Sequence, residues 1–178
     1  MSPEMTSEPP TAGAQHEPRL DRLLRELVER RPIAALACLD EQGAPAVSMV
    51  SYAIDPATAD LLIHVSALAA HTRQMAADGR VGLMVLGADG EAESPQALPR
   101  VSLGAQASFV EPGGEETAHC QRIYLARHPQ AERMTQLPDF RFVRLQVQSV
   151  RQVQGFGAAR SVEAVRWREL FTRLPGAS

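Results

Sequence analysis

The sequence predicts a mainly β protein, a closed antiparallel barrel with helices at its periphery. Three observations predict it: apolar stretches of strand length outnumber helical ones, they follow one another directly along the chain, and turns rather than long crossover helices separate most of them. A chain of 178 residues, of which 44% are apolar, can bury one core, so one domain is expected.

The N-terminal part predicts a leader followed by a helix. Residues 1–18 contain four prolines and no apolar periodicity, a composition that cannot offset the entropy lost on ordering, so we expect a disordered leader. In residues 19–31, apolar side chains recur every three or four positions and predict an amphipathic helix that Pro32 ends. The folded domain is therefore expected to span residues 19–178.

The first half of this domain predicts four strands around one short helix. The apolar runs that mark the strands are residues 33–39, 46–54, 61–65 and 80–86. Residues 40–45 contain Gly43 and Pro45 and predict a hairpin with a longer loop. Residues 68–78 are rich in alanine and predict the helix, whereas residues 87–99, acidic and with glycine and proline, predict an exposed loop.

The second half predicts two more strands and two more helices. The strands are expected at residues 100–110 and 140–153, and the helices at 115–127 and 162–174. The stretch 140–153 is expected as one bent strand or two short ones, interrupted at Gly155-Phe156-Gly157. Ser161 is expected to cap the last helix, on which Trp167 and Phe171 are packing residues.

Charge and composition exclude several classes of partner. With 18 basic and 21 acidic residues the net charge is −3, and only 4% of the residues are aromatic, so nucleic acid is not an expected partner. No run approaches the roughly 20 apolar residues that span a bilayer, and the polar start does not resemble a signal peptide. A cytoplasmic protein without membrane contact is expected, with Cys38 and Cys120 as unreactive packing residues.

The stretch from Leu61 to Met75 carries the most chemistry. A strand passes through a tight connection into a helix start, where Ser66, Thr72 and Arg73 add donors of the kind that a phosphate needs. The same spacing also fits an ordinary solvated helix start with a surface arginine. Composition does not decide between the two.

Six short motifs follow one another along residues 19–160. They are Ala35-Leu36-Ala37 with Gly43-x-Pro45-x-x-Ser48, Val65-Ser66-x-Leu68-Ala69-x-His71-Thr72-Arg73, Arg100-Val101-Ser102-Leu103, Tyr124-Leu125-x-x-His128-Pro129, Asp139-Phe140, and Gly155-Phe156-Gly157-x-Ala159. In this order they resemble the haem-utilisation type of flavin-binding split barrel, a relative of pyridoxamine phosphate oxidase. The resemblance implies a split antiparallel β-barrel that binds FMN between the two subunits of a homodimer.

The resemblance also implies which residues bind the cofactor. They are Ser48, Met49, Val50, Ser51, His64, Val65, Ser66, His71, Thr72, Arg73 and Arg100. The first four are expected along the flavin ring and ribityl chain, with the next three on the neighbouring strand. His71, Thr72 and Arg73 are expected at the phosphate, and Arg100 is expected to reach in from the second subunit.

Departures from the oxidase limit what can be transferred. Ser48 stands where the oxidase has an arginine, and His71 stands where it has a phosphate-binding lysine, so part of the charge for the phosphate is missing or conditional on pH. The oxidase's C-terminal substrate motif is not recognisable, which argues against vitamin B6 oxidation.

Three functions stay open on this basis. The first is a flavin-dependent oxidoreductase with a small-molecule electron donor or acceptor, for which the sequence shows no catalytic residue and no metal site. The second is a haem-binding protein; that family ligates iron with a histidine beyond the barrel, and no histidine follows His128 here. The third is a split barrel whose cleft is blocked and which binds without catalysis.

The remaining histidines are expected to be structural. His16 lies in the leader, His119 is expected on the exposed face of its helix, and His128 is expected to cap that helix.

Overall fold

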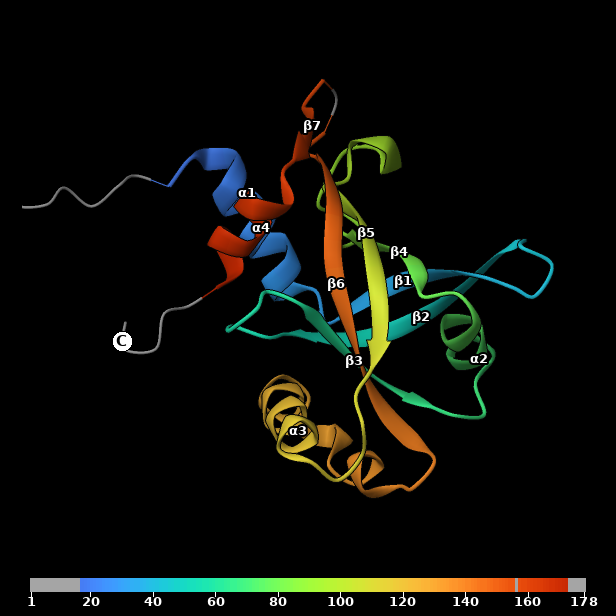
Figure 1. Ribbon diagram of the computed structural model, residues 1–178. Coiled ribbons are helices and arrows are strands. Elements are labelled where there is room, and N and C mark those ends of the chain that lie inside the picture. The colour runs from blue at the N-terminus through green and yellow to red at the C-terminus, as the bar shows by residue number, and fades with distance from the viewer. Residues whose placement is uncertain (1–16, 156, 173–178) are drawn as a thin grey trace, which may run out of the picture.

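Six antiparallel strands close into a barrel in the computed structural model, which describes residues 17–155 and 157–172 (Figure 1). The strands are β1 (Ile33–Leu39), β2 (Pro45–Ile54), β3 (Leu61–Ser66), β4 (Arg80–Leu86), β5 (Arg100–Phe109), β6 (Phe140–Val153) and β7 (Ala159–Val162). The helices are α1 (Arg19–Arg30), α2 (Ala70–Ala77), α3 (Glu115–Arg127) and α4 (Ala164–Phe171). Short 3₁₀ turns lie at Pro95–Ala97, Pro129–Ala131 and Met134–Gln136.

The strand order is β3-β2-β1-β4-β5-β6-β7, and a further pairing of β3 with β6 closes the first six strands. Every pairing of neighbours is antiparallel. The predicted mainly β barrel with peripheral helices is therefore confirmed.

One junction of the barrel is short. Strand β2 pairs with β1 from Pro45 to Ser51, but it pairs with β3 only at Tyr52, Ala53 and Ile54. Strand β3 pairs with β6 over its whole length. Beyond the pair Tyr52–Ile63, β2 and β3 therefore diverge. From there on, the backbone edges that the two strands turn towards one another are not paired with each other.

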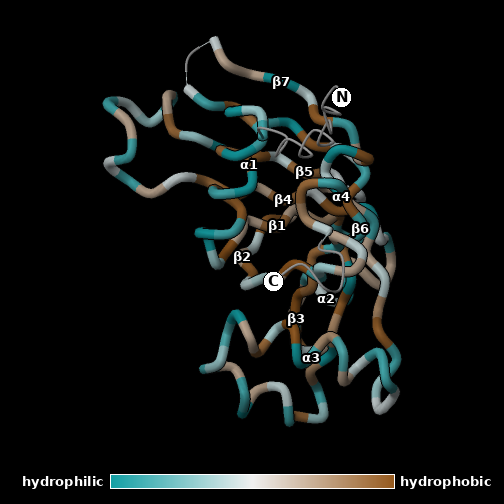
Figure 2. The backbone as a smooth tube through the Cα atoms, turned by 90° about the vertical axis from the view of Figure 1, so that its left-hand side faces the viewer, coloured by the Kyte–Doolittle hydropathy of each residue, from teal (hydrophilic) through white to brown (hydrophobic). Residues whose placement is uncertain are grey.

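Alternating apolar residues fill the barrel. Leu36, Leu61, Ile63 and Leu145 are completely buried, and each such side chain contributes roughly 1.5–3 kcal/mol to stability. Figure 2 shows the hydrophobic residues concentrated along the strands and the hydrophilic ones in the connecting loops.

Helix α3 covers the outside of the barrel where β2, β3 and β6 meet. Its buried residues Cys120 and Tyr124 pack with Leu62 and Phe142 in a second, smaller apolar cluster. The ribbon shows α3 at the end of the barrel away from α1 and α4 (Figure 1).

Helices α1 and α4 are joined through a buried carboxylate. Asp21 accepts hydrogen bonds from Arg160 at 2.5 Å and from Arg166 at 2.6 Å. Trp167 and Phe171 pack on each other with ring centroids 4.2 Å apart, which confirms their structural role. Pro18 precedes α1 and Glu17 bonds to Arg25, so these two residues contact the domain; the rest of the predicted leader, with His16, lies outside the described residues.

One local prediction at the C-terminal end was wrong. Ser161 does not cap the last helix: it lies in β7, a strand that the sequence did not predict, and Glu163 precedes α4 instead. The stretch 140–153 forms one strand, which agrees with the first of the two predicted alternatives, and its pairing with β5 shifts at Gly104 and Ala105. Gly155 and Gly157 both have positive φ, which allows the chain to turn between β6 and β7.

Within the described ranges, no helix is long and apolar enough to cross a membrane. Cys38 and Cys120 are free thiols, both buried. Burial raises the pKa of each thiol and so lowers its reactivity.

Candidate functional site

The divergence of β2 and β3 brings most of the residues expected at a cofactor to one opening. Ser48, Met49, Val50 and Ser51 lie on the β2 edge of this opening, and His64, Val65 and Ser66 lie on its β3 edge. Helix α2, which carries His71, Thr72 and Arg73, follows β3 directly. Seven of these positions therefore occupy two strand edges that face one another, and three occupy the adjacent helix.

His64 is held in an aromatic cluster beside the opening. Its ring centroid lies 5.0 Å from that of Phe140, 4.5 Å from Phe142 and 5.8 Å from Tyr124. Burial lowers the pKa of His64 to about 4, so the imidazole is neutral near pH 7. Neither ring nitrogen bonds to another described residue.

The β2 edge presents both apolar and polar groups. Met49 is 61% exposed, whereas Val50 points into the core. The hydroxyl of Ser48 is buried without a hydrogen-bond partner among the described residues. Burial raises the pKa of Tyr124, and a hydrogen bond with Ser51 partly offsets that rise, so Ser51 lies against α3.

The hydroxyl groups expected at a phosphate already donate within the protein. Ser66 donates to the carboxylate of Asp139 at 2.8 Å, and Thr72 donates to the carbonyl of Ser66 at 2.6 Å. Arg73 gives one N–H to the carbonyl of Leu68 at 2.9 Å and keeps the rest of its guanidinium exposed. Of the three, only Arg73 has donors left for a ligand.

His71 lies in the first turn of α2 and is half-buried. Its imidazole makes no hydrogen bond to another described residue. Burial lowers the pKa of its imidazole. The neutral form is therefore favoured, which is the opposite of what a phosphate-binding cation requires.

Arg141 is a candidate that the sequence reasoning missed. It lines a hollow of about 350 Å³ together with Thr72, Arg73 and Phe109. Arg141 pairs with Val65 and lies two and four residues before Val143 and Leu145, so its side chain starts from the same face of β6 as these buried residues. A charged residue in phase with buried ones was the signal that could have identified it.

Arg100 does not join the others within one chain. It begins β5, opposite Leu86 and Val153, and donates to the carbonyls of Gln96 at 3.0 Å and Leu98 at 3.2 Å. Its expected contact with a cofactor requires a second subunit.

An apolar face extends across the outside of the sheet from the β2 edge. Ala35 pairs with Met49 on one side and with Met84 on the other, so these three residues form a row across β2, β1 and β4. Val47 is 73% exposed and Met84 40% exposed. We call Ile33, Val47, Met49, Met84 and Leu86 the exposed sheet face. Such a contiguous apolar patch is typical of an interaction surface.

The two histidines of α3 differ from one another. His128 is buried at the C-terminal end of α3 and donates from Nε2 to the carbonyl of Tyr52 at 2.8 Å, which confirms a structural role. The side chain of His119 is 35% exposed, but it is not merely a surface residue, because its Nε2 lies 3.0 Å from the completely buried carboxylate of Asp55. A distant β-turn supplies this partner, so helix periodicity could not reveal it.

Comparison with known proteins agrees with this geometry. The family model for pyridoxamine 5′-phosphate oxidase matches residues 20–154. The chain is 32% identical over 147 residues to the haem oxygenase HutZ of Vibrio cholerae, with 81% of each chain covered. It is 30% identical over 118 residues to a chloroplast non-canonical haem oxygenase, HOZ, of Arabidopsis thaliana, covering 66% of this chain and 34% of that one.

A solved structure supports the same relationship. The haem-binding protein of Mycobacterium smegmatis superposes with a TM-score of 0.76 at 27% identity, covering 86% of this chain. This chain spans 62% of that protein, less than two thirds of its length.

Proposed function

Because the chain belongs to the pyridoxamine 5′-phosphate oxidase family, in its haem-utilisation branch, we propose that it binds haem at the opening between β2 and β3. The observation that carries the proposal is a pair of unpartnered imidazoles, that of His64 on the β3 edge of this opening and that of His71 in the first turn of the adjacent helix α2. Burial lowers the pKa of both, and neither bonds to another described residue. Neutral imidazole is the form that binds iron.

The two histidines have different roles in this proposal. Three aromatic rings enclose His64, which suits a wall against the macrocycle. His71 has no ring contact with a described residue, so we assign it as the iron ligand. When bound, haem supplies a redox-active iron.

Arg73 and Arg141 would hold the haem propionates. Both line the hollow beside α2, and none of the other described residues that line it is acidic. Phe109 gives the same hollow an apolar surface. An apolar body with two carboxylates therefore finds matching chemistry there.

FMN is the second candidate, and the unpartnered hydroxyl of Ser48 favours it, because this group lies on the strand expected along the ribityl chain. The phosphate fits less well. The hydroxyl groups of Thr72 and Ser66 already donate their hydrogen bonds within the protein, and the Asp139 carboxylate beside Ser66 repels a second anion. With FMN bound, the chain would be a flavin-dependent oxidoreductase that exchanges electrons with a small donor or acceptor.

The proposal includes a homodimer. The exposed sheet face adjoins the β2 edge, and a second copy would cover it while bringing its own Arg100 toward the opening. The site would then be complete only in the dimer.

Spectral titration tests the proposal. Haemin added to the purified chain should give a saturable Soret shift, and the His71→Ala variant should lose the spectrum of imidazole-ligated iron while His64→Phe retains it. Arg73→Ala combined with Arg141→Ala should lower haem affinity about tenfold or more. Quenching of FMN fluorescence by the added protein, without a Soret shift on addition of haemin, would favour the second candidate. No response to either cofactor would leave a binding protein without a cofactor.

A further inference from the structure

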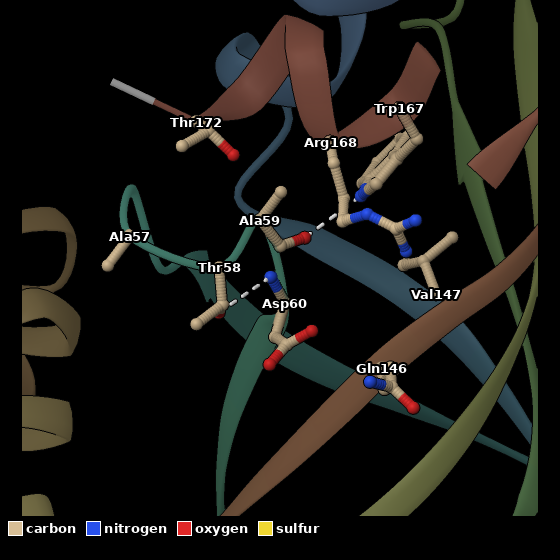
Figure 3. A pocket seen from close by; sticks show the side chains of 9 residues that line it. All are labelled: Ala57, Thr58, Ala59, Asp60, Gln146, Val147, Trp167, Arg168 and Thr172. Carbon is tan, nitrogen blue, oxygen red and sulfur yellow. Dashed lines mark hydrogen bonds between the residues drawn. The ribbon is translucent and has the colours of Figure 1, made fainter. Parts of the chain in front are cut away.

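A second pocket lies between the β2–β3 turn, strand β6 and helix α4 (Figure 3). Its volume is about 290 Å³, and none of the residues expected at the cofactor lines it. Pockets for drug-sized ligands run from roughly 300 to 1,000 Å³. This size suits a small metabolite rather than a macrocycle or a flavin.

One wall of the pocket is apolar. Trp167 is 1% exposed and Val147 is buried beside it. The indole N–H of Trp167 donates to the carbonyl of Ala59 at 2.9 Å (Figure 3). With this donor used, the ring offers only carbon to the pocket.

The other wall carries polar groups, two of which are not engaged. The side chains of Gln146 and Arg168 make no hydrogen bond or ion pair with another residue in the described part of the chain. The hydroxyl of Thr58 accepts from the amide of Asp60 at 3.2 Å and also hydrogen-bonds to the Asp60 carboxylate. Figure 3 shows Asp60, Gln146 and Arg168 around one space, each from a different element.

Asp60 is poorly paired for a carboxylate in its position. Its side chain is 16% exposed, and Nη1 of Arg144 is 3.6 Å away. That nitrogen lies closer to Asp55, at 2.7 Å, and Nε of Arg144 bonds to Glu116 at 2.8 Å. Burial raises the pKa of Asp60, and its hydrogen bond with Thr58 and the nearby charges of Arg144 and Arg168 offset that rise only in part. A donor from a ligand would complete its pairing.

The pocket therefore has a carboxylate and a guanidinium that do not bond to one another: within the described ranges no ion pair joins Asp60 and Arg168. The Asp60 carboxylate attracts a simple cation, but the Arg168 guanidinium repels it. A simple anion is attracted by Arg168 and repelled by Asp60. A molecule with both charges satisfies both groups. We propose that this pocket binds a small ammonium carboxylate, with its nitrogen at Asp60, its carboxylate at Arg168 and its carbon chain against Trp167.

The single tryptophan of the chain makes the test specific, because Trp167 itself lines the pocket. The full chain is titrated with glycine, β-alanine, γ-aminobutyrate and valine, which vary the charge spacing and the apolar bulk, while tryptophan emission is recorded. Propionate and propylamine each carry one of the two charges. At least one ammonium carboxylate should give a saturable change, with binding about tenfold or more tighter than either half-ligand.

Variants locate the contacts. Asp60→Asn and Arg168→Gln should each weaken binding about ten- to a hundredfold, because each removes one charge-assisted hydrogen bond. Arg151→Gln, which changes an exposed arginine of β6 outside the pocket, should bind like wild type. Thermal unfolding confirms that each variant folds. The proposal is overturned if none of the four compounds gives a saturable change, if a half-ligand binds equally well, or if folded Asp60 and Arg168 variants retain full affinity.

Discussion

Replacing Asp55 by asparagine should destabilise the protein by about 3 kcal/mol. The Asp55 carboxylate is completely buried and accepts hydrogen bonds from Arg144 at 2.7 Å, from the amide of Ala57 at 2.9 Å and from His119 at 3.0 Å. Removing one partner of a buried ion pair costs roughly 3–5 kcal/mol. Arg144 keeps its bond to Glu116, so we expect the lower end of that range.

Glu116→Gln is the matched control, because Glu116 bonds to the same arginine but its side chain is 57% exposed. An exposed ion pair contributes at most about 1 kcal/mol. Urea unfolding, followed by the emission of the buried Trp167, measures both variants. Equal and small losses in the two would refute the argument that burial of the Asp55 carboxylate sets the size of the effect.

The pH dependence gives a second check. The pKa of Asp55 is lowered in the folded state by its hydrogen bonds to Ala57, Arg144 and His119, against the opposing effect of burial. A lowered carboxyl pKa stabilises the fold above the ordinary value of about 3.9, and that contribution is lost as the pH falls through the folded pKa. The stability difference between wild type and Asp55→Asn should therefore be constant from about pH 5 to 8 and shrink below about pH 4.

Two further predictions concern the candidate site. The pKa of His64 is about 4 when folded and about 6.5 when unfolded, so between these pH values the unfolded chain binds a proton that the folded chain does not. The free energy of unfolding should therefore fall as the pH drops from 6.5 towards 4. The His64→Phe variant should lack this part of the pH dependence when urea unfolding is measured at each pH. The double variant Val47→Glu, Met49→Glu should sediment as a folded monomer instead of a dimer, because both side chains lie on the exposed sheet face. Leu68→Glu changes an exposed side chain outside that face and should leave the dimer intact. A wild-type monomer at micromolar concentration would contradict the dimer.

Most of the fold could be predicted because hydrophobic periodicity is local. The prediction of a strand at 46–54 missed only Pro45 of β2, and that at 80–86 coincides with β4. Strand β7 escaped because its four residues include Arg160 and Ser161, and its pairing with Val150–Val153 is visible only when the turn at Gly155 is formed. A strand defined by its partner rather than by its own pattern is not readable from sequence.

The candidate site could be predicted as a set of positions but not as a chemistry. Sequence order and resemblance brought the β2 and β3 edges and the start of α2 together. They could not show that the Thr72 hydroxyl donates a hydrogen bond to the carbonyl of Ser66, or that burial lowers the pKa of His71 and so favours its neutral form. These properties depend on contacts between residues, and they shift the balance from a phosphate towards an iron-bound macrocycle.

The turn between β2 and β3 connects the two parts of the molecule at which we propose ligands. Asp55 at its start anchors α3, which carries Tyr124 against His64, and Asp60 at its end lines the pocket beside Trp167. Arg144 reaches both carboxylates, at 2.7 Å and 3.6 Å. A ligand nitrogen at Asp60 would leave Arg144 wholly to Asp55 and Glu116. It would also stabilise the fold by RT ln(1 + [L]/Kd), about 2.7 kcal/mol at a hundredfold excess over Kd. Filling this pocket should therefore tighten the packing of α3 on the barrel and, through Tyr124, the aromatic wall of the opening where we place haem.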